Sequence, residues 1–540
     1  MLGVAVVVAW FIYRRTVAYD LPAGAVEGEI AWQPAQPGAP PRLMYGSASL
    51  AWLGGVAVLH VSGDPHAMGA SHGRLLGPTL PAVLGAIAPS IAGTVSRDGL
   101  LGELSYAARL AWRWRFVDDG LLDPDRQMIA GLVRGAAASG VTLGYDHAVR
   151  AQAVLDVGAP SPRSDQADQR AIAHSLTLIG AQAQMPTRVF IGRAVSLPGL
   201  DDGGDAAIPV VTIARPDGRI AWAGVGWPGE LGVVTGINAE GIAVLVNPAR
   251  TVDVRVTRTA RPIALVARSV LEQARTLDAA IKLIESSPTL GAALFAVIDG
   301  TTGKWVQIER TPGRAIIERS PRSPALGDVL TTTALASDPE NDRARRMLPT
   351  PSRVERAARL LRAPLGDAAA MAAILRDRRA PDDSPRPPGH RGVIDDGRAV
   401  QTVIIDPASL ALWVGDPSAG GQLRALDLRH ELRGEGDRAT PAADIAAEAG
   451  DADHDALAAA RADLRIARAA LLAGQPARAA EACARARARA PMLPEAIELD
   501  AIIAQARGDQ ARARATFQTW LDIGPDNPRG EERARAALAR

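Results

Sequence analysis

Few side chains in this 540-residue sequence are of types and spacings that could bind a metal or act as nucleophiles. The single cysteine, Cys483, excludes an internal disulfide framework and any thiolate metal cluster. His66 and His72 have no third ligand at a fitting spacing, so we expect them in a turn and at a helix start. His390 follows a Pro-rich stretch and is expected in a solvated loop. The sequence predicts no metal site and no cofactor.

The charge of the whole chain is balanced, which argues against a nucleic-acid partner. Sixty basic residues stand against 59 acidic ones, so no whole-chain basic field is available to attract nucleic acid. The chain has no Gly-rich phosphate loop, and its central part does not interleave aromatic with basic residues. We therefore expect no nucleic-acid partner.

The elements that must position any site follow from apolar periodicity in residues 43–433. Short strand-like runs pair across Gly- or Asp-centred turns, such as residues 215–219 and 299–303, and such short connections are typical of antiparallel hairpins. Helices are predicted over residues 127–137 and 264–285. Hairpins with helices grouped between them indicate an α+β sandwich of two sheets covered by helical layers. The expected strands are residues 55–61, 208–213, 220–225, 241–247, 293–299, 305–309, 314–318, 399–406 and 411–414.

A repeat of 34 residues organises residues 456–540. Residues 474–479 align with residues 508–513 at this offset, and Pro491 falls on Pro525. A 34-residue period of helix, Gly turn, helix and Pro is the signature of tetratricopeptide repeats, which this segment resembles. Two repeats are fewer than the roughly three needed for a stable array, so we expect them to lean on another part of the protein. Cys483 is then a core residue.

The composition of the remaining segments predicts two flexible connections and an N-terminal anchor. An apolar run in residues 1–19 predicts a signal anchor or signal-like segment, although it is shorter than the roughly 20 residues of a membrane span. Residues 20–42 are rich in Pro, Gly and Ala and predict a tether, and residues 434–455 predict a linker. The anchor indicates a membrane-associated or cell-envelope protein, with the side of the membrane left open.

A series of motifs in residues 43–433 resembles the penicillin acyltransferase-like group of N-terminal-nucleophile (Ntn) hydrolases. The order of the motifs matches that of the group, and the series spans nearly the whole segment. The matching stretches are residues 62–69 (Ser-Gly-Asp-Pro-His-Ala-Met-Gly) with 72–73 (His-Gly), residues 129–135, residues 192–193 (Gly-Arg) with 198–199 (Pro-Gly), residues 236–242 (Gly-Ile-Asn-Ala-Glu-Gly-Ile), residues 402–407, and residues 412–414.

This resemblance implies a four-layer αββα fold made as a precursor that cuts its own backbone. The new N-terminal residue would act as nucleophile through its side chain and as base through its amine, whose pKa near 8 leaves a useful neutral fraction at physiological pH. The group's nucleophile is a cysteine, supported by an Arg, an Asp and Asn residues. Arg193 and Asn238 are the positions that match this support, and we expect them side by side.

The sequence departs from the group at the reacting centre. No cysteine is present there; an ungapped alignment to Gly180 places Ala173 at the nucleophile position, and a small gap places Ser175 there. A serine hydroxyl can also drive the acyl shift that cleaves the chain, and the polar stretch of residues 160–170 is suited to cleavage. Ala194 and Ser196 replace the Asn and Asp, and residues 332–334 read Thr-Thr-Ala where the group often has Thr-Asn-His.

Three readings of function remain open from the sequence. The first is an acyltransferase or amide hydrolase that uses Ser175, Arg193 and Asn238, with the repeats docking a protein partner. The second is a protein with a degenerate active site that still binds a small amide or acyl ligand. The third is a scaffold that works through its repeats, in which residues 43–433 resemble the group only in fold. For the protein as a whole, we expect contact with a membrane through its N-terminal segment. Whether the protein is an enzyme is undecided, because the expected Cys, Asn and Asp are missing.

Overall fold

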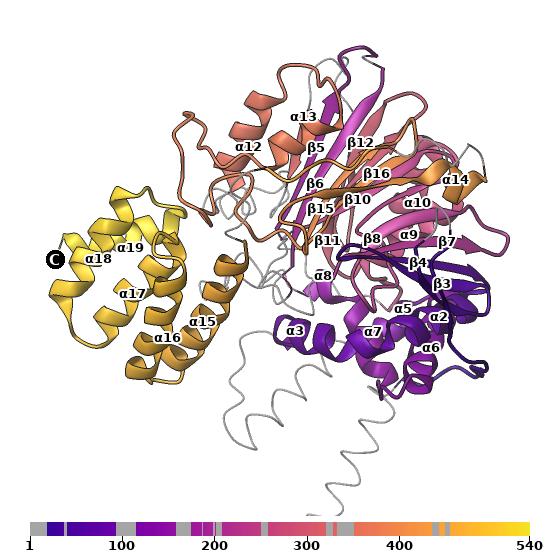
Figure 1. Cartoon of the computed structure of the whole chain (residues 1–540), viewed down its shortest axis with the longest axis horizontal. Helices are drawn as coiled ribbons and strands as arrows, with labels where there is room; N and C mark the ends of the chain where they lie inside the picture. The colour runs from indigo at the N-terminus through magenta and orange to yellow at the C-terminus, as the bar shows by residue number, and fades with distance from the viewer. Residues whose placement is uncertain are drawn as a thin grey trace, which may run out of the picture.

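The computed structural model describes residues 19–36, 40–92, 115–157, 174–185, 187–197, 200, 208–249, 258–319, 328–331, 350–434, 442–448 and 454–539. Within these residues, two β-sheets lie face to face with helices on both outer sides, and a separate group of helices forms the C-terminal end (Figure 1). The larger sheet has the order β1 (Ala31–Gln33), β2 (Arg42–Tyr45), β3 (Ala48–Leu53), β4 (Val56–Gly63), β7 (Val210–Pro216), β8 (Trp222–Gly226), β9 (Thr235–Asn238), β10 (Ile242–Ala249), β11 (Ala292–Asp299), β12 (Trp305–Arg310) and β13 (Ala315–Arg319). The smaller sheet has the order β14 (Asp328–Thr331), β5 (His174–Ala181), β6 (Val189–Ser196), β15 (Gln401–Asp406), β16 (Ala411–Gly415) and β17 (Leu423–Asp427).

Three hydrophobic cores separate four layers. One core lies between the two sheets and includes Ile191, Leu245 and Val403. A second core packs the outer face of the larger sheet against helices, and a third packs the outer face of the smaller sheet against two helices. The larger sheet is covered by α2 (Pro65–Leu76), η1 (Gly77–Thr79), α3 (Leu80–Ala92), α5 (Val117–Gly120), α6 (Asp123–Ala138), α7 (Tyr145–Gln152), α8 (Val154–Val157), α9 (Ile263–Gln273) and α10 (Leu277–Ser286), and the smaller sheet by α12 (Thr350–Leu360) and α13 (Ala368–Leu375). This is the two-sheet sandwich that the sequence predicts.

The predicted hairpins are present, and one predicted helix is divided. Strands β7 and β8, β11 and β12, and β15 and β16 pair antiparallel, while β4 and β7 pair in parallel across a long excursion through the helices. The segment 264–285 forms α9 and α10, because Thr276 leaves the helical conformation and its side chain accepts a hydrogen bond from the Ala279 amide as a new N-cap.

Two glycine pairs bring the backbones of α2 and α6 into contact. A Cβ built on Gly131 would lie 2.2 Å from the carbonyl oxygen of His66, and one on Gly73 would lie 2.2 Å from that of Leu132. Gly69 and Gly135 make the same kind of approach, to the Met128 and Ala70 carbonyl oxygens. Two of the motifs that carry the family resemblance therefore contain the glycines of one helix–helix contact.

Part of the predicted tether pairs with the larger sheet, and part of the predicted linker pairs with the smaller sheet. Within residues 20–42, β1 pairs with β2 at the edge of the larger sheet, so this stretch differs from the expected tether. Within residues 434–455, Ile445 bridges to Leu423 and the Ala443 carbonyl accepts a hydrogen bond from Trp413 Nε1 at 3.0 Å. Both short segments gain backbone partners that composition alone does not reveal.

No helix in the described part of the chain is long and apolar enough to cross a membrane. The predicted anchor falls almost entirely on residues 1–18, which lie outside that part.

The C-terminal helices form two further small cores of their own. They are α15 (His454–Leu472), α16 (Pro476–Arg489), α17 (Pro494–Ala506), α18 (Gln510–Asp522) and α19 (Pro528–Leu538), while α14 (Leu428–Arg433) belongs to the sandwich. Gly474 and Gly508 adopt positive φ angles of 69° and 80° after α15 and α17, as expected of turn glycines. Cys483 is a buried core residue, and burial raises the pKa of its thiol to about 12.

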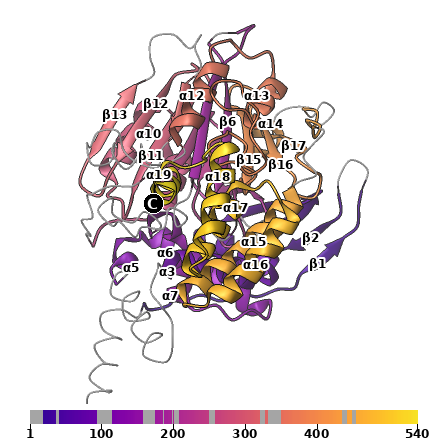
Figure 2. The ribbon, with the colours of Figure 1, turned by 90° about the vertical axis from the view of Figure 1, so that its left-hand side faces the viewer.

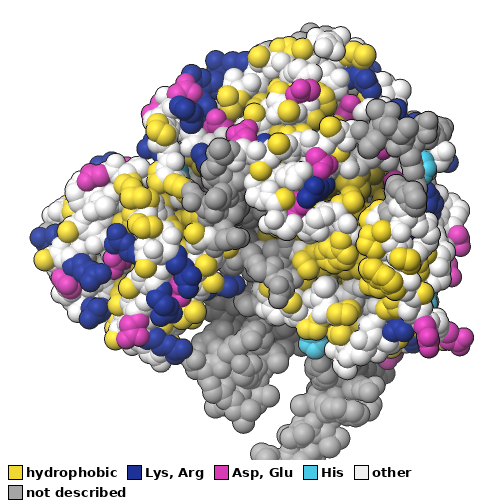
Figure 3. Space-filling view, in the orientation of Figure 1, with side chains coloured by type: hydrophobic (Ala, Val, Ile, Leu, Met, Phe, Trp, Pro, Cys, Tyr) yellow, Lys and Arg dark blue, Asp and Glu magenta, His cyan; other side chains and the backbone are white. Residues whose placement is uncertain are grey.

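These helices lie against the sandwich (Figure 2). Ion pairs connect them to one of its loops. Arg391 pairs with Glu498 and Asp526 at 2.9 and 2.6 Å, and Arg398 pairs with Glu495. His390, which the sequence places in a solvated loop, is instead buried at this contact, where Gly392 N–H donates to its Nδ1. The outer surface of the helices carries basic and acidic side chains side by side (Figure 3).

Candidate active site

A cluster of polar side chains lies between the two sheets. Because side chains alternate along a strand, Thr177 on β5 and Arg193 on β6 share the face of the smaller sheet that meets the larger one, as do Ile179 and Ile191. Thr235 on β9 and Asn247 on β10 face them from the larger sheet. All four side chains are fully buried.

Arg193 is the centre of this cluster. Its guanidinium donates to Thr177 Oγ1 at 2.7 Å, to Thr235 Oγ1 at 3.3 Å, and to Asn247 Oδ1 and the Val246 carbonyl oxygen. Among the described residues its partners are neutral oxygens, with no carboxylate among them. Burial lowers the pKa of Arg193 to about 9, which leaves the guanidinium charged at neutral pH. The cluster thus supplies a buried positive charge held by fixed hydrogen bonds.

Ser175 lies one step further along the same face of β5. It is the second residue of the strand and stands opposite Val195 of β6, two residues from Thr177 and so about 7 Å along the strand. Its side chain is buried, and its Oγ has no hydrogen-bond partner among the described residues. Burying a hydroxyl without a partner costs about 1–3 kcal/mol, and this is the kind of group that a functional site retains.

Asn238 does not lie beside Arg193, contrary to the sequence-based expectation. Thr235 and Ile237 of β9 face the smaller sheet, so Asn238 faces the helices. Its Nδ2 donates to the Leu271 and Ala274 carbonyl oxygens at 3.0 and 2.8 Å. Its Oδ1 accepts the Glu240 and Ile242 amides. Asn238 therefore fixes the β9–β10 turn against α9.

Asn247 and Thr177 occupy the positions that sequence reasoning missed. Asn247 interrupts the apolar run of β10, and Thr177 stands between Leu176 and Leu178 of β5. An isolated polar residue inside an otherwise buried strand is the signal that could have identified both.

The positions that depart from the family pattern lie away from Arg193. Ala194 belongs to the core beneath α12 and α13, and Ser196 shares its strand face. Side chains at these positions on β6 therefore point away from the space between the sheets. Ala173, the polar stretch 160–170 and residues 332–334 lie outside the described residues.

Among the described residues, the histidines form no metal site. His72 is buried on α2, and its Nε2 accepts the Gly229 amide at 2.8 Å. Burial lowers the pKa of His72 to about 4, so its ring is neutral. Within the described residues, no group of three or more His, Cys, Asp or Glu side chains could hold a metal ion.

Residues 211–387 match the family model of acyl-coenzyme A:6-aminopenicillanic acid acyltransferase. Over this segment the chain is similar to penicillin acyltransferase-like proteins. The matched segment covers about a third of the chain, from β7 to the loop after α13. It includes Thr235 and Asn247, while Ser175 and Arg193 precede it.

Solved structures with likeness to this chain include two kinds of hydrolase. A Caenorhabditis elegans ortholog of N-acylethanolamine-hydrolyzing acid amidase is 15% identical with a TM-score of 0.32, covering 43% of this chain and 93% of that one. Two variants of conjugated bile acid hydrolase from Clostridium perfringens are each 10% identical with a TM-score of 0.28, covering 48% of this chain and 93% of theirs. No curated protein matches this chain significantly.

Proposed function

We propose that this protein is an acyltransferase or amide hydrolase whose nucleophile is the Ser175 hydroxyl. The observation that carries the proposal is the buried Ser175 Oγ without a partner, on the strand face that holds the Arg193 cluster. A penicillin acyltransferase-like body supports the reaction class, which is acyl transfer from an amide.

The reaction requires the peptide bond between His174 and Ser175 to be cut. The freed α-amine of Ser175 would then take the hydroxyl proton as the hydroxyl attacks the substrate carbonyl. Collapse of the tetrahedral intermediate expels the amine, which receives that proton, and leaves an ester on Ser175. Water then releases the acid, or an acceptor amine takes the acyl group. Arg193 would hold positive charge near the site during both steps, where a fixed donor lowers the barrier by about 3 kcal/mol.

Strand geometry favours Ser175 over Thr177 as the new N-terminus. A cut before Ser175 removes from β5 only the pairing of His174 with Ser196. A cut before Thr177 would also remove the pairings of Ser175 and Leu176 with β6, and that of Leu176 with Thr331 of β14.

A second candidate is a binding protein without catalysis. Arg193 already has its hydrogen bonds met by Thr177, Thr235 and Asn247, which is an arrangement that stability alone could maintain. In this case the same region would bind a small amide or acyl ligand without cleaving it.

We further propose that α15–α19 are tetratricopeptide repeats that bind a protein partner, and that the N-terminal segment anchors the protein to a membrane. The 34-residue offset and the turn glycines Gly474 and Gly508 support the repeat assignment. Because the sandwich loop occupies Glu495, Glu498 and Asp526, a partner would bind on another face of these helices.

The test is the intact mass of the protein comprising residues 20–540, with Ser175→Ala and Thr177→Ala as variants. We expect two fragments cut between His174 and Ser175, and a single chain for Ser175→Ala. Ser175→Ala has no described hydrogen bond to lose, so we expect its thermal midpoint to equal or exceed that of the wild-type protein. An uncut wild-type chain would exclude the proposed self-cleaving enzyme and would favour the second candidate, a binding protein without catalysis. A cut before Thr177 would assign the nucleophile to Thr177.

A further inference from the structure

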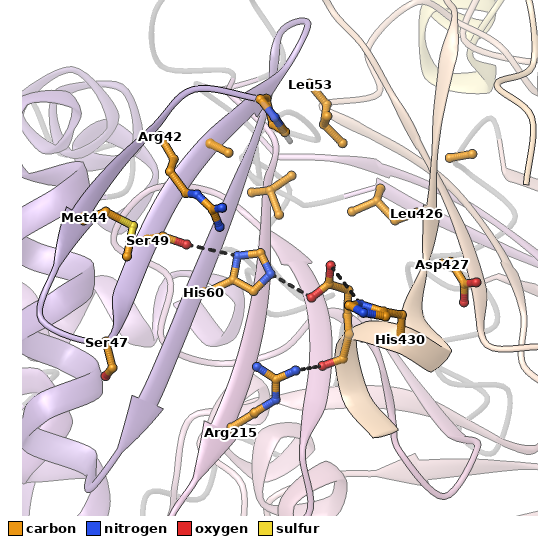
Figure 4. A pocket seen from close by; sticks show the side chains of 15 residues that line it. Arg42, Met44, Ser47, Ser49, Leu53, His60, Arg215, Leu426, Asp427 and His430 are labelled. Carbon is orange, nitrogen blue, oxygen red and sulfur yellow. Dashed lines mark hydrogen bonds and ion pairs between the residues drawn. The ribbon is translucent and has the colours of Figure 1, made fainter. Parts of the chain in front are cut away.

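A cavity lies at one edge of the sandwich, away from the Arg193 cluster. It has a volume of about 490 Å³, within the range of small-molecule sites. Its floor is formed by β2, β3 and β4, and its roof by the end of β17 and by α14 (Figure 4). Strand β8 separates it from the cluster in the larger sheet, and β15 and β16 do so in the smaller one. It is therefore distinct from the candidate active site.

The floor changes from apolar to polar along the strands. Arg42, Ala51 and Val58 lie in one cross-strand row, and the next row contains Met44, Ser49 and His60. Leu53 extends the apolar end. Beyond Leu53, the Gly55 amide donates to Asp416 Oδ1 at 2.9 Å and links the larger sheet to the smaller one.

The polar end is closed by contacts between the floor and α14. His60 Nε2 lies 3.0 Å from Glu431 Oε2, and Arg215 donates to the Glu431 carbonyl oxygen (Figure 4). Burial alone would raise the pKa of Glu431, but the hydrogen bond and charge of His60, with the charges of His430 and Arg215, bring it below its ordinary value. Glu431 is therefore an ionised group whose charge is already met.

Arg42 is the cation of the cavity without a described counter-charge. Its guanidinium points into the cavity toward His60, and no described residue pairs with it or accepts a hydrogen bond from it (Figure 4). The other acid in the lining, Asp427, caps α14 by accepting the Arg429 amide at 2.9 Å and pairs with Arg429. Both acids of the lining already have partners, because Glu431 contacts His60 and Asp427 pairs with Arg429. Arg42 therefore remains available to an anion, and the apolar walls beside it suit an anion with a hydrophobic tail.

We propose that this cavity binds a medium-chain carboxylate, with its head group on Arg42 and its acyl chain against Leu53, Val58 and Leu426. A guanidinium binds a carboxylate through two parallel hydrogen bonds, which fixes the orientation of the head. The chain then runs from the His60 row toward the apolar end at Leu53, where it removes apolar surface from water.

Ser49, His60 and Glu431 resemble a nucleophile, base and acid, but the geometry favours binding over catalysis. Ser49 Oγ lies 3.5 Å from His60 Nδ1, a long contact. Ser49 also pairs on both sides, with Met44 and with His60, so its backbone belongs to the sheet ladder and cannot stabilise an oxyanion.

The experiment is calorimetric titration of the full chain with octanoate, octanamide and acetate. Octanoate should bind, and both octanamide and acetate should bind at least about tenfold more weakly, because each lacks either the charge or the chain. Arg42→Gln should weaken octanoate binding by about tenfold, whereas Arg42→Lys should retain part of the affinity. Arg219→Gln, at an exposed arginine in the β7–β8 turn, is the matched control and should bind like the wild-type protein.

Three outcomes would overturn the proposal. One is equal binding of octanoate and octanamide, another is equal binding of octanoate and acetate, and the third is unchanged octanoate binding by Arg42→Gln. Equal thermal midpoints for wild type and Arg42→Gln establish that a weakened affinity does not come from misfolding. Because Ser175 and Arg193 are unaltered in every variant, the result does not depend on the proposed catalytic function.

Discussion

At the scale of single residues, burial determines which charged groups titrate abnormally. Glu230, between β8 and β9, and Asp156, on α8, are both buried, and burial raises the pKa of each to about 8. The Gly232 amide and the charge of Arg268 oppose the shift at Glu230, and the Gly291 and Ile263 amides oppose the shift at Asp156. Both carboxyl groups are therefore mainly protonated in the folded protein at neutral pH.

The raised pKa of Glu230 predicts that the free energy of unfolding declines as the pH rises. Between the ordinary pKa of 4.5 and the folded value of about 8, the unfolded chain has lost the Glu230 proton while the folded protein keeps it. The thermal midpoint should fall from pH 5 to pH 8, and Glu230→Gln should reduce that fall because Gln needs no proton. Glu355→Gln, at an exposed position of α12, is the control and should follow the wild-type curve. The prediction is wrong if Glu230→Gln and wild type fall in parallel.

At the scale of elements, the packing of α2 on α6 depends on the absence of side chains. Gly131 sits over the His66 carbonyl and the Ala70 amide, which are backbone atoms and cannot turn aside as a flexible side chain would. The same approach occurs at Gly69, Gly73 and Gly135. This contact holds the first helix that follows β4 against the helical layer, so it contributes to the stability of the whole outer face.

Gly131→Ala should accordingly destabilise the protein by about 1–3 kcal/mol, because the two helices must separate to admit a methyl group. Gly85→Ala is the matched helical control: its Cβ would meet nothing within 4 Å, and the change should stabilise by up to about 1 kcal/mol. Unfolding free energies from urea titration compare the two. Equal effects of the two substitutions would refute the close-packing account.

At the scale of the molecule, the C-terminal helices are joined to the sandwich by charge. Arg391 reaches from a sandwich loop to Glu498 of α17 and to Asp526, and Arg461 of α15 donates in return to the carbonyl oxygens of Asp396 and Gly397. Burial raises the pKa of Asp526, but the charge and hydrogen bonds of Arg391 outweigh it and hold that pKa below its ordinary value. The stability that this pair contributes is therefore present above about pH 4 and is lost as the pH falls further.

Arg391→Ala should release the C-terminal helices from the sandwich. The substitution leaves the buried Asp526 without its cationic partner, while Glu498 keeps its pair with Arg533, and it should cost roughly 3 kcal/mol at this contact. Hydrogen exchange should then rise in α15–α19, and proteases should cleave residues 434–455 faster. Arg507→Ala, at an exposed arginine after α17, should change neither. Unaltered exchange in Arg391→Ala would mean that other contacts hold the two parts together.

Much of the element pattern could be predicted from sequence because it depends on neighbours along the chain. Alternation predicted the hairpins, and the 34-residue offset predicted the helix boundaries around Gly474 and Gly508. The division of the helix at Thr276 was missed because a capping residue inside an apolar pattern gives a weak signal. The pairing of β1 in the expected tether was missed because it depends on a second strand, β2, and the composition of the segment does not reveal that partner.

By itself, the sequence determined the types of element, their order, and the likeness of residues 211–387 to penicillin acyltransferase-like proteins. Only the tertiary structure decided which side chains meet. Asn238 and Asn247 both lie on strands of one sheet, yet the first faces helices and the second faces Arg193. Alternation along a strand is local, but which of its two faces meets the second sheet depends on how the layers pack, and that involves residues far apart in the chain.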